Sequence, residues 1–153
     1  MKHTLLVLAV FGVVVSSLAL REHYREYGDS PCSINERWDC GVVNHSPFAL
    51  VGGVFDQLGI HSHIPLVSAM PVATAGILGY ILMAVVALRR SYRFLMVLTL
   101  ASLAFSLYLA HIERDVLGVW CVYCVISLGI ISLMSVLSLG AVIRQAARQP
   151  APA

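Results

Sequence analysis

The four cysteines are the residues of this 153-residue chain with the most evident chemistry, and they fall into two pairs. Cys32 and Cys40 are separated by seven residues in a hydrophilic segment, whereas Cys121 and Cys124 enclose a Val-Tyr dipeptide at the start of an apolar run. Cysteine sulfurs can form structural disulfides, exchange disulfides with other thiols or bind zinc. The spacing and surroundings of the two pairs help to decide between these chemistries.

The Cys121 and Cys124 pair favours redox chemistry. On a helix these two residues share one face, with Cβ atoms about 5 to 6 Å apart, so a disulfide can close with some adjustment. Near a helix N-terminus, unpaired amides and the helix dipole favour a thiolate over a thiol. Trp120 and Tyr123 flank the pair as in the aromatic belt of a membrane interface, which predicts that Cys124 lies slightly within the membrane.

Two other interpretations of the cysteines stay open. Two inert bridges, one within each pair, would only brace an outer loop of a small structural subunit, although closing such short loops removes little chain entropy. A site of four thiolates would bind zinc, but Cys-x7-Cys is not a common zinc spacing, and an oxidising compartment favours disulfides. We therefore expect no metal.

Four apolar runs must position the cysteines. A hydrophobic content of 59% and a mean hydropathy of +0.84 indicate that lipid is the main solvent. Each run has the length of a helix that crosses about 30 Å of hydrocarbon, and lipid allows no open strands. We predict an all-α membrane protein with one domain over 1–153, a four-transmembrane-helix bundle whose helices span about 4–20, 64–88, 94–112 and 119–143.

The charges outside these runs sort by sign. Basic residues without acids lie at both termini and between the second and third runs: Lys2, Arg89, Arg90, Arg93, Arg144 and Arg148. All eight acidic residues lie in the first and third loops. Because basic loops stay in the cytoplasm, we expect both termini inside and all four cysteines outside.

The net charge and the N-terminal sequence each bear on an alternative interpretation. The net charge of +2 does not indicate a nucleic-acid partner. Residues 1–19 could instead be a cleaved signal peptide, since Ser17-Leu18-Ala19 resembles a cleavage site, but the apolar run is longer than usual for such a peptide.

The large outer loop over 21–63 should contain a short amphipathic helix. Ser46 is a suitable N-cap and Pro47 suits the first helical position, while Ser46 could also hydrogen-bond a substrate. Apolar residues then recur at helical spacing, which predicts a helix lying flat on the outer mouth of the bundle: Phe48, Val51, Val54, Phe55 and Leu58. His45, His61 and His63 lie near the outer surface and His111 ends the third run beside Glu113 and Asp115, so any of these histidines could relay protons, but solvated loop residues are the simpler interpretation.

The order of these features resembles the vitamin K epoxide reductase family. The features are Cys32-x7-Cys40, then Ser46 six residues on, then Cys121-x2-Cys124 opening the fourth helix, and together they span nearly the whole chain. The segment from Met70 to Tyr80 is also similar to bacterial members of the family.

This resemblance implies a four-helix bundle around a quinone, either ubiquinone or menaquinone. Cys121 and Cys124 would be the active-site disulfide, Cys32 and Cys40 the shuttle pair. Cys32 would meet the thiol of a separate thioredoxin-fold, DsbA-like protein, Cys40 would exchange with Cys121, and Cys124 would face the quinone in a pocket lined by Ser46. The implied function is thiol oxidation for disulfide formation, in a bacterial inner membrane with periplasmic cysteines.

Two departures from animal members bear on the substrate. Leu128 stands four residues after Cys124, where animal enzymes have a tyrosine, and the second helix begins without their asparagine. The alternative within the family, reduction of a quinone or of vitamin K epoxide as the product, is therefore less favoured. Many bacterial relatives carry a fused thioredoxin-like domain, whereas this sequence ends ten residues after the fourth predicted helix, so we expect the thiol partner to be a separate protein.

Overall fold

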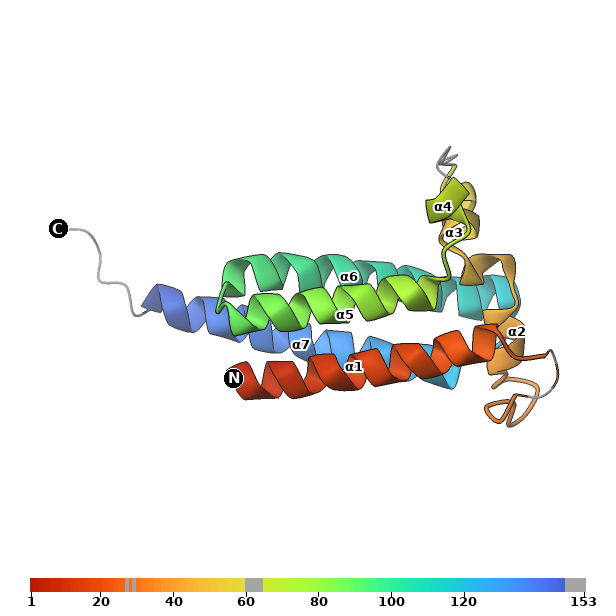
Figure 1. The fold of residues 1–153 in the computed structure, drawn as a ribbon, viewed down its shortest axis with the longest axis horizontal. Coiled ribbons are helices and arrows are strands. Elements are labelled where there is room, and N and C mark those ends of the chain that lie inside the picture. Colours follow the sequence, from red (N-terminus) through yellow and green to blue (C-terminus); the bar gives the residue numbers. More distant parts are fainter. Residues whose placement is uncertain (27, 29, 60–64, 148–153) are drawn as a thin grey trace.

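Four long helices lie side by side in the computed structural model, which describes residues 1–26, 28, 30–59 and 65–147 (Figure 1). They are α1 (Lys2–His23), α5 (Val72–Leu88), α6 (Tyr92–Ile112) and α7 (Val122–Ala147). The shorter elements are α2 (Cys40–Asn44), η1 (Pro47–Ala49), α3 (Val51–Gln57), α4 (Pro65–Ser68) and η2 (Glu113–Leu117). Within the described residues there is no strand, only isolated bridges, so the fold is all-helical as predicted.

Among the described residues, three helices are long and apolar enough to cross a membrane. They are Lys2–His23, Val122–Ala147 and the continuous helical stretch Tyr92–Leu117, in which η2 extends α6. The apolar α5 has 17 residues and is shorter. Large hydrophobic side chains such as Val7, Phe11, Val97 and Val136 are more than half exposed along these helices, as a lipid-facing surface requires. The molecule is therefore an integral membrane protein.

Each long helix packs against two others. Helix α1 contacts α5 and α7, and α6 contacts the same two helices from the other side. Buried Leu5, Tyr80, Leu95 and Met134 each come from a different helix and belong to one apolar core. These contacts form a bundle in which all four helices contribute side chains to one interior.

The predicted helix over 64–88 is broken near its start. Helix α4 ends at Ser68, α5 begins at Val72, and residue 64 lies outside the described residues. The reason is Pro71, which has no N–H to donate and disfavours a helical conformation at Met70. Val51 N–H donates to Met70 O at 2.9 Å, so the residues at this break also hold the part of the outer loop that contains Val51. The other long helices differ from the predicted bounds by a few residues at their ends.

The predicted amphipathic helix is divided into η1 and α3. Ser46 stands at the N-cap position with Pro47 next to it, but its hydroxyl donates to Val43 O at 2.7 Å and does not cap η1. Leu50 then adopts an extended conformation and forms a bridge with Pro71, which ends η1 and starts α3. Helices α3 and α4 project to the side at the α2 end of the bundle (Figure 1).

Close contact between α1 and α5 depends on Gly12. A Cβ added there would lie 2.5 Å from ring atoms of Tyr80, which is buried. The Tyr80 hydroxyl donates to Ser127 O at 3.1 Å and lies 2.9 Å from Ser127 Oγ, so it also joins α5 to α7. Gly12 therefore allows the Tyr80 ring, and with it the Tyr80 hydroxyl, to take this position inside the bundle.

Candidate active site

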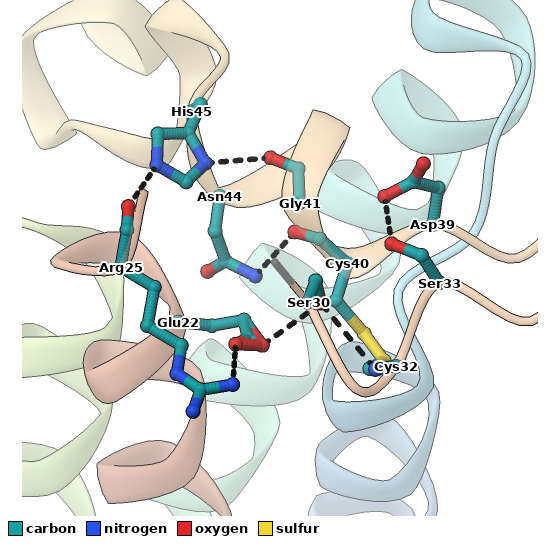
Figure 2. A network of polar contacts seen from close by, with 10 residues as sticks. All are labelled: Glu22, Arg25, Ser30, Cys32, Ser33, Asp39, Cys40, Gly41, Asn44 and His45. Carbon is teal, nitrogen blue, oxygen red and sulfur yellow. Dashed lines mark hydrogen bonds and ion pairs between the residues drawn. A yellow bond between two sulfur atoms is a disulfide. The ribbon is translucent and has the colours of Figure 1, made fainter. Parts of the chain in front are cut away.

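Cys32 and Cys40 form a disulfide at one end of the bundle, with their Cα atoms 5.5 Å apart (Figure 2). Both side chains are buried, and Cys40 has no exposed surface. Cys40 is the first residue of α2, whose N-cap is Asp39: the carboxylate accepts the Val42 N–H at 3.2 Å. The cap fixes the start of α2 and therefore the position of the Cys40 sulfur.

Two carboxylates hold the loop that carries Cys32 (Figure 2). Glu22 at the end of α1 is buried and accepts a hydrogen bond from Ser30 Oγ at 2.9 Å. Ser30 Oγ in turn accepts the Cys32 N–H at 3.4 Å. On the other side of the disulfide, Ser33 Oγ donates to Asp39 at 2.7 Å. The Ser33 hydrogen bond is the main reason that the pKa of Asp39 is lowered, helped by backbone N–H donors and opposed by burial.

A short backbone pairing brings the two cysteine pairs together. Trp38 and Trp120 form a parallel bridge, in which Trp120 N–H donates to Arg37 O at 2.8 Å and Asp39 N–H donates to Trp120 O at 3.1 Å. The next residues along the two segments are Cys40 and Cys121, which belong to one buried apolar cluster. The loop disulfide therefore lies beside the first cysteine of the Cys-x-x-Cys pair.

Cys121 and Cys124 are free thiols in the structure. Cys121 has no exposed surface and directly precedes α7, while Cys124 lies in its first turn and is partly exposed. A hydrogen bond from the Cys124 thiol lowers the pKa of Cys121, helped by amides at the start of α7 and opposed by burial and the charge of Glu113. Cys121 is therefore the thiol of this pair that is better prepared to react as a thiolate.

A cavity of about 390 Å³ opens beside Cys124. Its volume lies in the range of pockets for small organic ligands. All four long helices line it, mainly with apolar side chains. The polar groups around it include Ser46 from the predicted site, together with His23, Asn44, Tyr80, Glu113 and Ser127. Cys124 and Ser46 thus face one cavity, whereas Cys32, Cys40 and Cys121 do not line it.

Two residues in this region were not predicted as site residues. Asn44 ends α2, is buried, and donates its side-chain N–H to Cys40 O at 2.9 Å while lying 3.7 Å from Cys121 Sγ. Glu113 was placed only in the third loop, but no more than 4% of its surface is exposed, and Glu113 Oε2 accepts the Cys121 N–H at 3.0 Å. Its position directly after the third apolar run was a weak signal of burial, and Asn44 had none.

The described part of the chain contains no group of three or more His, Cys, Asp or Glu side chains that could hold a metal ion. The arrangement instead combines a disulfide, an adjacent pair of thiols and an apolar cavity. It is typical of a membrane oxidoreductase that handles electrons through thiols.

The model of the vitamin K epoxide reductase family matches residues 3–139, and the chain belongs to this family. The match confirms the resemblance inferred from the cysteine spacing. A comparison with curated proteins found no match. Family membership implies an oxidoreductase with disulfide and quinone chemistry in a membrane, and members work in general with thioredoxin-like partners.

Proposed function

We propose that this protein oxidises the thiols of a separate thioredoxin-fold protein on the outer face of its membrane. It passes the electrons to a quinone in that membrane. Cys32 and Cys40 form the shuttle disulfide that accepts two electrons from the partner. Cys121 and Cys124 form the second pair, which delivers these electrons to the quinone. The product on the partner is a new disulfide, so the protein supports disulfide formation.

The observation that carries this proposal is the neighbourhood of Cys40 and Cys121 in one buried cluster. Disulfide exchange needs a thiolate close to a disulfide sulfur. After the partner has reduced the shuttle pair, the Cys40 thiolate attacks Cys121 of an oxidised Cys121–Cys124 bridge and releases Cys124. Cys32 then attacks Cys40, which regenerates the shuttle disulfide and leaves Cys121 and Cys124 reduced. Two electrons have then moved from the shuttle pair to Cys121 and Cys124.

The cavity beside Cys124 supports a quinone as the electron acceptor. Its apolar lining from four helices suits a ring with a hydrophobic tail. Ser46 is proposed to contact the quinone. Its hydroxyl donates to Val43 O, and its oxygen retains the capacity to accept a hydrogen bond from an O–H group of the hydroquinone product. Whether ubiquinone or menaquinone is the natural acceptor depends on the host membrane.

We also propose that α5 is a fourth membrane span, in one domain over 1–153 of a bacterial inner membrane. Its 17 residues lie at the short end of the range that crosses a bilayer, and α5 packs between α1 and α6. An even number of spans places both termini on the same side. The basic residues beyond the spans support a cytoplasmic location for the termini and a periplasmic one for the cysteines.

The test compares two single substitutions in the full chain in detergent. Cys124→Ala should abolish reduction of a short-chain ubiquinone by any thiol donor, because no other described thiol lines the cavity. Cys32→Ala should lose oxidation of a reduced thioredoxin-fold protein but keep oxidation of dithiothreitol, which can reach Cys121 and Cys124 directly. Quinone turnover that persists in Cys124→Ala, or equal loss of both donors in Cys32→Ala, would contradict the relay.

A further inference from the structure

Glu113 is a buried carboxyl at the junction between the thiol pair and the cavity. It lines the cavity together with Cys124. Glu113 Oε2 also accepts the Cys121 N–H at 3.0 Å. The residue begins η2, a single π-helical turn of a kind that often marks functional sites. The Glu113 side chain thus binds the backbone of Cys121 and lines the same cavity as Cys124.

Burial of a carboxyl at this place costs free energy, which suggests a functional reason for Glu113. No ion pair of Glu113 exists among the residues that the structure describes, and burial of an unpaired carboxylate is strongly unfavourable. The other titratable side chains around the cavity are His23 from α1, Tyr80 from α5, and Tyr123 and Cys124 from α7. Among them Glu113 is the carboxyl, a group that readily exchanges a proton with a thiol.

We propose that Glu113 is the proton carrier of the quinone-reducing step, an inference that rests on the proposed function. In this step the sulfurs of Cys121 and Cys124 form a disulfide, and two electrons pass to the quinone. Glu113, protonated at rest, gives its proton to one quinone oxygen and takes the proton of the Cys124 thiol. It then gives this proton to the second quinone oxygen and takes the proton of Cys121, which returns the carboxyl to its protonated state. The thiols lose two protons and the hydroquinone gains two, so atoms and electrons balance.

A purely structural role for Glu113 makes a different prediction. The carboxyl satisfies an amide that would otherwise be unpaired at the start of α7. In Glu113→Gln the amide oxygen can still accept this N–H, and the side-chain volume is nearly unchanged. The variant therefore keeps the structural hydrogen bond but cannot carry a proton.

The experiment measures the two half-reactions separately in the full chain. Fully reduced protein is mixed rapidly with short-chain ubiquinone, and quinone absorbance is followed from pH 5 to 8. Glu113→Gln should slow this step about 100-fold or more, in line with the usual effect of a positioned acid or base. It should also remove the pH dependence that the carboxyl gives the wild-type rate. Exchange between the shuttle pair and Cys121, measured without quinone, should stay within two-fold of wild type.

Two further variants complete the test. Asp115→Asn changes a half-exposed carboxyl on the same turn, which pairs with His111, and should leave both half-reactions unchanged. Glu113→Asp keeps a carboxyl on a shorter side chain and should recover part of the quinone rate lost in Glu113→Gln. If Glu113→Gln does not fold, Glu113→Asp must still slow quinone reduction selectively against wild type, and an unchanged rate would overturn the inference.

The outcomes separate this inference from the proposed function. If wild-type protein does not reduce quinone, the proposed function itself fails. If wild type reduces quinone and Glu113→Gln does so within three-fold, only the role of Glu113 is overturned. Equal slowing of exchange and quinone reduction would likewise reduce Glu113 to a structural cap.

Discussion

The Asn44 side-chain nitrogen lies 3.7 Å from Cys121 Sγ and at the same time donates to Cys40 O at 2.9 Å. A single buried amide therefore joins the last residue of α2 to both cysteines between which exchange is proposed. A hydrogen bond to sulfur stabilises a thiolate more than a thiol, because the thiolate is the stronger acceptor. Asn44 is thus suited to stabilise Cys121 as the leaving thiolate when the mixed disulfide is resolved.

We predict that Asn44→Ala slows exchange between the two cysteine pairs about ten-fold. A hydrogen bond to a charged acceptor contributes roughly 1.5 kcal/mol, which corresponds to about this factor. Rapid quenching with an alkylating reagent, followed by mass spectrometry, measures the exchange rate. Gln57→Ala, which removes an exposed amide from α3, is the control and should have the wild-type rate. Identical rates in both variants would exclude this role of Asn44.

Removal of Cys32 should trap the relay at its intermediate. In Cys32→Ala, the Cys40 thiolate can attack an oxidised Cys121–Cys124 bridge, but the thiol that resolves the product is gone. Alkylation of the released Cys124 then prevents the reverse reaction. Non-reduced digests should contain the peptide around Cys40 linked to the peptide around Cys121. A digest with only the Cys121–Cys124 linkage and free Cys40 would leave the loop pair with a structural role.

Gly12→Ala should destabilise the bundle by about 1 to 3 kcal/mol, the usual effect of overpacking a core. The added Cβ would lie 2.5 Å from the Tyr80 ring, which is held by Ser127 and packed in the interior. The midpoint of thermal unfolding in detergent measures the effect. In the control Gly129→Ala, the new Cβ meets no atom within 4 Å, so stability should stay the same or rise slightly. A stable Gly12→Ala protein would show that Tyr80 can move freely.

Acid should loosen the start of α2 through Asp39. Because the folded-state pKa of Asp39 is lowered, its contribution to stability is fully present above the unfolded-state value near 3.9 and is lost as pH falls through the folded-state pKa. Thermal unfolding between pH 2 and 5 should therefore show a steeper loss for wild type than for Asp39→Asn. Glu36→Gln, at an exposed carboxyl of the same loop, should follow wild type. Parallel curves for all three proteins would refute this assignment.

The proposed topology predicts the location of reporters fused to the chain. A phosphatase that is active only outside the cytoplasm should be inactive after Arg93 and active when inserted after Glu36. The basic loop before α6 is retained inside, whereas the acidic loop is exported. Activity after Arg93 would reverse the proposed orientation and place the cysteines in the cytoplasm.

The sequence predicted the membrane helices and the family, but not the packing of the site. Continuous apolar runs were sufficient for α1, α6 and α7, and the cysteine spacing led to the family that the comparison confirmed. The break at Pro71 was visible in the sequence but was outweighed by the hydropathy of the whole run. The roles assigned to the four cysteines and Ser46 stay predictions.

The burial of Glu113 and the position of Asn44 depend on contacts between distant segments. Glu113 is buried because η2 and the left-handed Gly118 return the chain to the start of α7, where the carboxyl meets Cys121 N–H. Asn44 reaches Cys121 across 77 positions of sequence. Hydropathy and spacing describe local preferences, so neither contact could be inferred from them.

The Trp38–Trp120 pairing divides the seven residues between Cys32 and Cys40 into two parts with different tolerance to changes in length. An added residue between Trp38 and Cys40 would shift the start of α2, and with it Cys40, relative to the backbone pairing that places Cys40 near Cys121. An added residue at Glu36 would lengthen only the exposed turn that Asn35 closes with Trp38. Insertions at this turn would therefore change the surface that meets the proposed thiol partner, while the proposed exchange between Cys40 and Cys121 would keep its geometry.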